Sequence, residues 1–389
     1  MQLKTMISTM AAVATCLLGG PLAVATQAQP PTTGAHQALD RFIVEKMDKA
    51  GILGLGAAII VDRKVAWKKG HGFADRERGI PFTPDSVMNI GSISKTFTGV
   101  ALMRVVEDER LSLDEDINSY LPFRVVNPHH PDAKITLRHL ATHTSGITDR
   151  LSVYKDTYHY DGRVPEPLGE FLKSYFVPGG TQYSKDNFLN VKPGTHRDYS
   201  NIAAGLAGCI VEVSVGEKLN AYARKIIFSP LRMNDTAWQL SDVEPARHAK
   251  LYVVQNDLTI PISLYEGTTY PDGGVRTSVA DLSKFFIALL SDGVYDETRI
   301  LTKRSIDEML RFQYTRSHKP DNVILEEKNS GLFWSTKFDV TRIGHGGSDP
   351  GLKTEMLANL SKDIGVILFT NTSLPEQDMR QFTDIFIEI

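Results

Sequence analysis

Residues 86–116 read SVMNIGSISKTFTGVALMRVVEDERLSLDED. An apolar, strand-like run ends at Gly91, and the residues after it have the apolar spacing of a long, mostly buried helix. Ser92 and Lys95 stand at this junction, three residues apart, so a helical turn would place their side chains on one face. A lysine near a helix N-terminus opposes the helix dipole, which favours a functional role for Lys95 over a structural one.

The Ser-x-x-Lys spacing alone is weak evidence. In the structural alternative, Ser92 caps the helix and Lys95 is a solvated lysine. A second copy, Ser152 to Lys155, lies in a tyrosine-rich loop with no strand-to-helix transition, so the spacing also arises by chance. In the functional alternative, the lysine takes the proton of the serine, provided that burial or a positive field lowers the pKa of Lys95.

Strand-like segments occur at both ends of the chain. LGLGAAIIVDRKVAWKKGHG (residues 53–72) predicts a hairpin, and the runs SGLFWSTKF, TRIGHGG, KTEMLANL and IGVILFTNT predict further strands between residues 330 and 372. The middle of the chain is mainly short helices and long polar loops, with better helices predicted at 202–216 and 218–231, and terminal helices are predicted at 36–51 and 375–389.

This order of segments predicts an α+β fold. An antiparallel sheet would be formed by the N- and C-terminal segments and flanked by the terminal helices, with a mostly helical lobe inserted between them. The expected domain covers residues 36–389, with a sheet lobe at about 36–91 and 266–389 and a helical lobe at about 92–265.

Residues 1–28 have the layout of a secretory signal peptide. An uncharged apolar stretch follows Lys4 and ends in small residues, so cleavage is expected after Ala28 or, as a less favoured alternative, after Ala25. Lipid attachment at Cys16 is disfavoured by the residue before it. The mature chain would be periplasmic or secreted and would keep only Cys209, whose apolar surroundings indicate a small buried side chain.

Composition excludes several classes of partner and cofactor. The net charge of -3 argues against binding to nucleic acid, and no apolar span is expected in the mature chain. His139 and His143 are four residues apart but lack the His-Glu-x-x-His context of a metal site, and no phosphate-binding glycine loop or Gly-x-Ser-x-Gly elbow occurs. No metal or cofactor is expected. The expected partner is a small-molecule or peptide substrate, and the oligomeric state stays open.

Two further patterns follow the first in sequence order. KPGTHRDYSNIAAGL contains the only Tyr-x-Asn of the chain, Tyr199 and Asn201, beside the start of a predicted helix. TRIGHGGSDPG contains His345-Gly346-Gly347-Ser348 in or beside a strand, and paired strand glycines often mark the close approach of backbone to a ligand. Taken alone, the Tyr-x-Asn pattern fits equally well a packed loop tyrosine with Ser200 or Asn201 as helix cap. Taken alone, the paired glycines fit a bulge or a hairpin turn.

In this order the three patterns resemble the motifs of the serine β-lactamase and penicillin-binding-protein superfamily. The resemblance is closest to the class C β-lactamase-like branch, which includes D-alanyl-D-alanine carboxypeptidases, D-aminopeptidases and β-lactamase-like carboxylesterases. The segments ITLRHLATHTSGI, IIFSPLRMNDT and PDGGVRTSVADLSKF also resemble that branch, so the agreement spans about residues 36–372.

The resemblance implies acyl transfer in two steps. Ser92 would form the acyl-enzyme, Lys95 and Tyr199 would share the transfer of protons, and water would release the acyl group. The backbone amides of Ser92 and Ser348 would form the oxyanion hole, and Asn201 would bind a substrate amide.

The third motif departs from the β-lactamase pattern, because His345 and Gly346 replace the lysine and hydroxyl residue of Lys-Thr-Gly. Histidine is mostly neutral near pH 7, which weakens the case for an efficient β-lactamase or carboxypeptidase. An esterase or a D-residue-specific peptidase is therefore expected. A transacylase or peptide cyclase, and a non-catalytic penicillin-binding-like sensor, are the alternatives. The long loop between Gly146 and Lys192 is expected to form a wall of the cleft, with tyrosines that bind an apolar or aromatic acyl group.

Overall fold

The computed structural model describes residues 34–389 apart from residue 257. The predicted signal peptide and Cys16 lie outside the described residues. Among the described residues, no helix combines the length and the apolar character needed to cross a bilayer.

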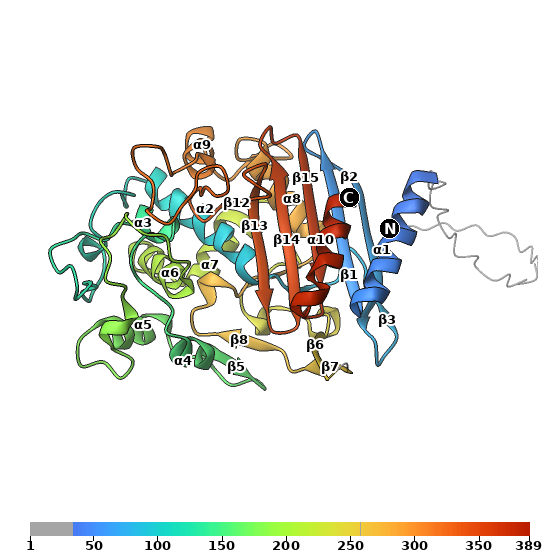
Figure 1. Cartoon of the computed structure of the whole chain (residues 1–389), viewed down its shortest axis with the longest axis horizontal. Helices are drawn as coiled ribbons and strands as arrows, with labels where there is room; N and C mark the ends of the chain where they lie inside the picture. Colours follow the sequence, from blue (N-terminus) through green and yellow to red (C-terminus); the bar gives the residue numbers. More distant parts are fainter. Residues whose placement is uncertain (1–33, 257) are drawn as a thin grey trace, which may run out of the picture.

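Seven strands form one antiparallel sheet in the order β12-β13-β14-β15-β1-β2-β3. Their bounds are β1 (Gly54–Val61), β2 (Lys64–Asp75), β3 (Ile80–Pro81), β12 (Ser335–Lys337), β13 (Arg342–Asp349), β14 (Leu352–Asn359) and β15 (Ile364–Thr370). Leu55 on β1 pairs with Thr370 on β15, so the two ends of the chain build one sheet, as the sequence predicted (Figure 1).

The predicted hairpin is β1 and β2, joined at Asp62 and Arg63. Both turn residues have positive φ, at 48° and 65°. Two consecutive residues in this region give the turn a twist that matches the right-handed twist of the strands.

Helices cover both faces of the sheet. The terminal helices α1 (Gly34–Ala50) and α10 (Met379–Glu388) pack on each other and share a core with one face of β1, β14 and β15 (Figure 1). The opposite face packs against α8 (Val279–Leu290), which contacts β1 and β15 and belongs to the larger core that continues into the helical lobe. The predicted α+β architecture with flanking terminal helices is confirmed.

The helical lobe lies beside the edge of the sheet formed by β12 and β13 (Figure 1). The remaining helices are α2 (Ser94–Glu107), α3 (Leu137–Ala141), α4 (Leu151–Tyr154), α5 (Leu168–Phe176), α6 (Asn201–Val215), α7 (Leu219–Ala223) and α9 (Lys303–Leu310). Four small strand pairs complete the fold: β4 (Met88–Asn89) with β9 (Arg276–Thr277), β5 (Tyr158–Tyr160) with β8 (Tyr265–Gly267), β6 (Leu251–Gln255) with β7 (Leu258–Ile262), and β10 (Val294–Tyr295) with β11 (Thr298–Arg299).

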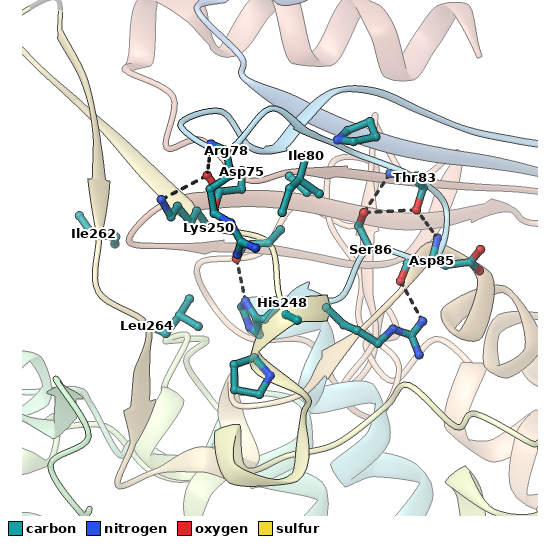
Figure 2. Close-up of a pocket in the computed structure, with 16 residues that line it drawn as sticks. Asp75, Arg78, Ile80, Thr83, Asp85, Ser86, His248, Lys250, Ile262 and Leu264 are labelled. Atoms are coloured by element: carbon teal, nitrogen blue, oxygen red, sulfur yellow. Dashed lines mark hydrogen bonds and ion pairs between the residues drawn. The ribbon is translucent and has the colours of Figure 1, made fainter.

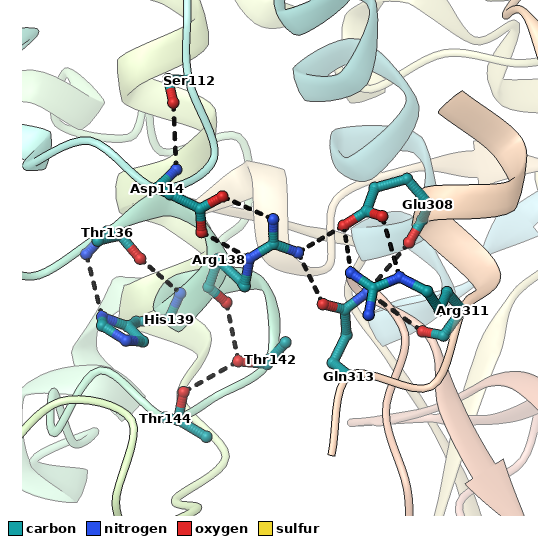
Figure 3. Close-up of polar contacts among 10 residues, drawn as sticks. All are labelled: Ser112, Asp114, Thr136, Arg138, His139, Thr142, Thr144, Glu308, Arg311 and Gln313. Carbon is teal, nitrogen blue, oxygen red and sulfur yellow. Dashed lines mark hydrogen bonds and ion pairs between the residues drawn. The ribbon is translucent and has the colours of Figure 1, made fainter. Parts of the chain in front are cut away.

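Arg138 on α3 ties the helical lobe to α9. Its guanidinium forms ion pairs with Asp114 at 2.6 Å and with Glu308 at 2.5 Å, and it donates to Gln313 at 2.7 Å (Figure 3). At the start of the same helix, Thr136 caps the backbone amide of His139. Since Glu308 lies on α9, these contacts fix a lobe helix to a segment that follows β11.

Two predicted elements differ from those observed. The strand predicted at Ser330–Phe338 is wrong in its first half, because Phe333 has positive φ and Leu332, Phe333 and Trp334 turn into the core. The helix predicted at 218–231 is shorter, because α7 passes into a π-helical turn at Arg224–Phe228.

Candidate active site

Ser92 lies in a short 3₁₀ turn, Gly91–Ile93, that leads directly into α2. Gly91 has φ +53°, and a Cβ atom there would lie 3.1 Å from Asp349 Oδ2 and 3.2 Å from the Cα of Gly347. The side chain of Ser92 caps neither helix, and Lys95 is fully buried, so the alternative of a capping serine and a solvated lysine is wrong.

The ammonium nitrogen of Lys95 has three oxygen neighbours. Nζ lies 3.0 Å from Ser92 Oγ, 2.7 Å from Asn201 Oδ1 and 2.9 Å from the carbonyl oxygen of Asp272. The amide and carbonyl oxygens can only accept, so they use two N–H bonds and leave the third position of Lys95 for Ser92.

The electrostatic surroundings favour the protonated form of Lys95. Burial acts to lower the pKa of Lys95, but the facing Tyr199 and Asp272 outweigh it, so the pKa is raised. The neutral lysine base expected from the sequence requires a lowered pKa, whereas in the structure the pKa of Lys95 is raised. The third position of Lys95 therefore carries a proton and donates to Ser92 Oγ.

Tyr199 and Asn201 reach the same site from the start of α6. The Tyr199 ring centroid is 4.9 Å from Lys95 Nζ, and the ring packs against His143 in a tilted arrangement, with 4.3 Å between the ring centroids. Ser200 is the N-cap and accepts from the amide of Ala203. Since Asn201 Oδ1 is engaged by Lys95, its NH₂ group is the part of the amide that can donate to a substrate.

Asp149, which the sequence argument missed, fixes this helix start. Its carboxylate accepts from the Ser200 hydroxyl at 2.7 Å and from the backbone amides of Asn201 at 2.8 Å and Ile202 at 3.0 Å. Asp149 lies far before α6 in the sequence. A local capping pattern therefore could not identify it.

The His345-Gly346-Gly347-Ser348 segment lies on β13, beside the turn that carries Ser92. A Cβ atom at Gly347 would lie 2.2 Å from the Ile90 carbonyl oxygen, so glycine permits the close approach of β13 to that turn. β12 pairs only with Arg342–Gly344. On the side of β12, the part of β13 after Gly344 therefore pairs with no named strand of the described chain.

His345 is buried and neutral. Burial, and then the charge of Lys95, lower the pKa of His345 to about 3. Its Nδ1 lies 2.7 Å from the Gly346 carbonyl oxygen, which can only accept, so the proton of the neutral ring is on Nδ1. His345 therefore contributes no positive charge to the cavity at neutral pH.

These segments line one cavity of about 390 Å³. Ser92, Tyr199, Asn201 and the residues His345 to Ser348 all contribute to its walls, and Lys95 lies buried beneath Ser92. Four basic side chains, Arg197, Lys328, Lys337 and Lys353, also line it and were missed in the sequence, because they come from segments distant from one another.

Two tyrosines of the long loop line the cavity and donate hydrogen bonds to two acidic side chains. The Tyr158 hydroxyl donates to Asp349 Oδ1 at 2.7 Å, and the Tyr154 hydroxyl donates to Asp272 Oδ1 at 3.3 Å. Burial raises the pKa of Asp349 to about 6 and that of Asp272 to about 7. The loop thus forms part of the wall, and its tyrosine hydroxyls are committed to these carboxyl groups.

The other singled-out residues lie elsewhere. Ser152 and Lys155 are exposed. His139 lies on the short helix α3, and the described residues contain no group of His, Cys, Asp and Glu suited to hold a metal. Cys209 is buried, which raises the pKa of its thiol to about 12. A larger cavity of about 560 Å³, around Asp75 and His248, contains none of the motif residues (Figure 2).

Comparison with protein families matches residues 39–385 to the family described as Beta-lactamase. Among curated proteins, the chain is 23% identical over 345 residues to Protein flp of Staphylococcus aureus (strain N315), covering 87% of this chain and 64% of flp. It is 27% identical over 328 residues to the mitochondrial Serine beta-lactamase-like protein LACTB of Mus musculus, covering 68% of this chain and 59% of that protein. The chain thus spans less than two thirds of either relative.

Among solved structures, the octameric penicillin-binding protein homologue from Pyrococcus abyssi superposes with a TM-score of 0.73. The two chains are 26% identical, and the match covers 90% of this chain and 77% of that one. The likeness therefore extends over the sheet and the helical lobe together.

Proposed function

Because the chain belongs to the β-lactamase family, whose members are β-lactamase-like serine hydrolases, we propose that it cleaves an ester or an amide through an acyl-enzyme on Ser92. The observation that carries this proposal is the 3.0 Å contact between Lys95 Nζ and Ser92 Oγ. The Tyr199 ring lies 4.9 Å from the same nitrogen, so nucleophile, cation and phenol meet in one cavity.

In the first step, Ser92 Oγ attacks the substrate carbonyl and its proton leaves for the paired Lys95 and Tyr199. In the reactive form the Tyr199 phenolate is paired with the Lys95 ammonium, so the phenolate oxygen accepts this proton while protonated Lys95 donates to Ser92. Tyr199 then gives this proton to the leaving alcohol or amine, and the acyl group remains bonded to Ser92 Oγ.

In the second step, a water molecule attacks the acyl-enzyme, its proton passes to Tyr199, and the acid is released as Ser92 regains a proton. The backbone amides of Ser92 and Ser348 would stabilise the oxyanion in both steps, which the close approach of β13 at Gly347 supports. The Asn201 NH₂ group would bind a substrate carbonyl.

Within this class, we propose an esterase or a D-residue-specific peptidase rather than an efficient β-lactamase. The supporting observation is the third motif, where a neutral His345 and a glycine at 346 take the place of a lysine and a hydroxyl side chain. The cavity position that these residues occupy therefore lacks both the charge and the hydroxyl donor of Lys-Thr-Gly.

The test is intact-protein mass spectrometry and turnover with a short-chain p-nitrophenyl ester and a fluorescent penicillin. The wild type is expected to hydrolyse the ester, and Ser92→Ala to lose activity by about 10³-fold or more. Ser152→Ala is the matched control, because it removes the exposed serine of the second Ser-x-x-Lys and should leave turnover unchanged. Equal activity in the two variants would rule out Ser92 as the nucleophile.

A further inference from the structure

One wall of the catalytic cavity carries an excess of positive charge. Arg197 precedes α6, Lys328 precedes β12, Lys337 lies on β12 and Lys353 lies on β14, and all four are half-buried lining residues. The chain as a whole has a net charge of -3, so this cluster is a local feature and not a general basicity of the surface.

Only one of these four cations has a carboxylate partner. Lys337 forms an ion pair with Glu355 on β14. Within residues 34–389 as described, no ion pair joins Arg197, Lys328 or Lys353 to an acid, and Nε of Arg197 is buried without a hydrogen-bond partner. The wall therefore carries charge that the protein itself does not neutralise.

Lys328 is held in position by neutral acceptors. Its Nζ donates to Ser335 Oγ at 2.7 Å and to the Thr336 carbonyl oxygen at 3.2 Å, which leaves one of its three N–H bonds for a ligand. Burial, and then Arg197 and Lys337, lower the pKa of Lys328 to about 8. The group remains mainly charged at pH 7, and a bound anion would offset both the burial and the repulsion.

We propose that the cavity selects esters or amides that carry a carboxylate, and that Lys328 and Arg197 bind this carboxylate. The inference rests on the proposed function and names the substrate class of the same site. A guanidinium can donate two parallel N–H bonds to a carboxylate, and the remaining N–H of Lys328 can add a third. Both residues lie outside the three motifs, and they supply the positive charge that neutral His345 does not.

The experiment compares paired substrates of which one member carries a carboxylate and the other does not. On the leaving-group side the pair is m-acetoxybenzoate and m-acetoxybenzamide. On the acyl side it is mono-p-nitrophenyl adipate and p-nitrophenyl hexanoate. The wild type is expected to favour the carboxylate of at least one pair by about ten-fold or more in kcat/KM.

In Lys328→Gln and in Arg197→Gln, this ratio is expected to fall by about ten-fold, mainly through KM. The matched control is Lys225→Gln, which removes an exposed lysine paired with Glu217, and it should leave the ratio unchanged. Ratios near one in the wild type, or ratios that both cavity variants retain, would overturn the inference.

A binding measurement separates this inference from the proposed function. Calorimetry on Ser92→Ala compares m-acetamidobenzoate with m-acetamidobenzamide and requires no turnover. Tighter binding of the benzoate that is lost in Ser92→Ala combined with Lys328→Gln would support the carboxylate site. This support would hold even if the wild type hydrolysed none of the esters. Absence of ester hydrolysis would refute the proposed function alone. The same measurement on the acyl side compares 6-(methylamino)-6-oxohexanoate with N-methylhexanamide, and equal binding within both pairs would overturn the carboxylate site.

Discussion

Replacing Asp272 by asparagine should change the way in which stability depends on pH. Asp272 is 5% exposed, and burial, opposed by the charge of Lys95, raises the pKa of its carboxyl group from 3.8 to about 7. Asparagine keeps the shape of the side chain and cannot ionise. The comparison of the two proteins therefore isolates the energetic cost of ionising this buried acid.

The sign follows from proton binding in the two states. Between about pH 4 and pH 7 the unfolded chain has released the proton of Asp272 while the folded protein retains it, so the unfolded state binds fewer protons. The contribution of Asp272 to the free energy of unfolding therefore falls as pH rises through this window. A difference of about 3 in pKa corresponds to about 4 kcal/mol in total.

Asp272→Asn should thus become steadily more stable relative to the wild type from pH 4 to pH 8, by up to about 4 kcal/mol. The assay is urea denaturation of both proteins at several pH values, with exposed Asp132→Asn as the control. Buried His143, His248 and His345 also affect the stability of the wild type, but their contributions are common to both proteins and cancel in the difference. A difference that stays constant with pH would refute this account of Asp272.

Two other substitutions test the packing of the site and of the lobe. Gly347→Ala places a Cβ atom 2.2 Å from the Ile90 carbonyl oxygen, so β13 must move away from Ser92, and ester turnover should fall by about 10²-fold or more with a loss of about 1–3 kcal/mol in stability. Unchanged kinetics would contradict the close approach. Arg138→Gln removes the ion pairs shown in Figure 3 and should lower the free energy of unfolding by about 1–3 kcal/mol, whereas a stability equal to wild type would show that these pairs contribute nothing.

The fold was predictable because its signals are local. The alternation of residues 53–72 and the charged turn at Asp62 and Arg63 specify a hairpin, and strand-like runs at both ends of the chain specify a shared sheet. The prediction of a strand was wrong for the first half of residues 330–338. A short apolar run such as Leu332 to Trp334 is compatible with a buried loop as well as with a strand.

The candidate site was predictable only in its motif residues. Ser92, Tyr199 and His345 were identified from local patterns, and they line one cavity; their catalytic roles stay predictions. The raised pKa of Lys95 depends on Tyr199 and Asp272, which approach it only in the folded chain. No local pattern in the sequence reveals such long-range contacts, and the same is true of the basic wall.

The pairing of β1 with β15 also constrains how this chain can fold. Leu55 lies opposite Thr370, and α1 packs on α10. During synthesis β1 therefore emerges long before its partner β15. Until then one edge of β1 has no partner, which exposes a row of free amide and carbonyl groups to other chains. Closing so long a loop is slow, so newly made chains should depend on protection from aggregation until the last strand arrives.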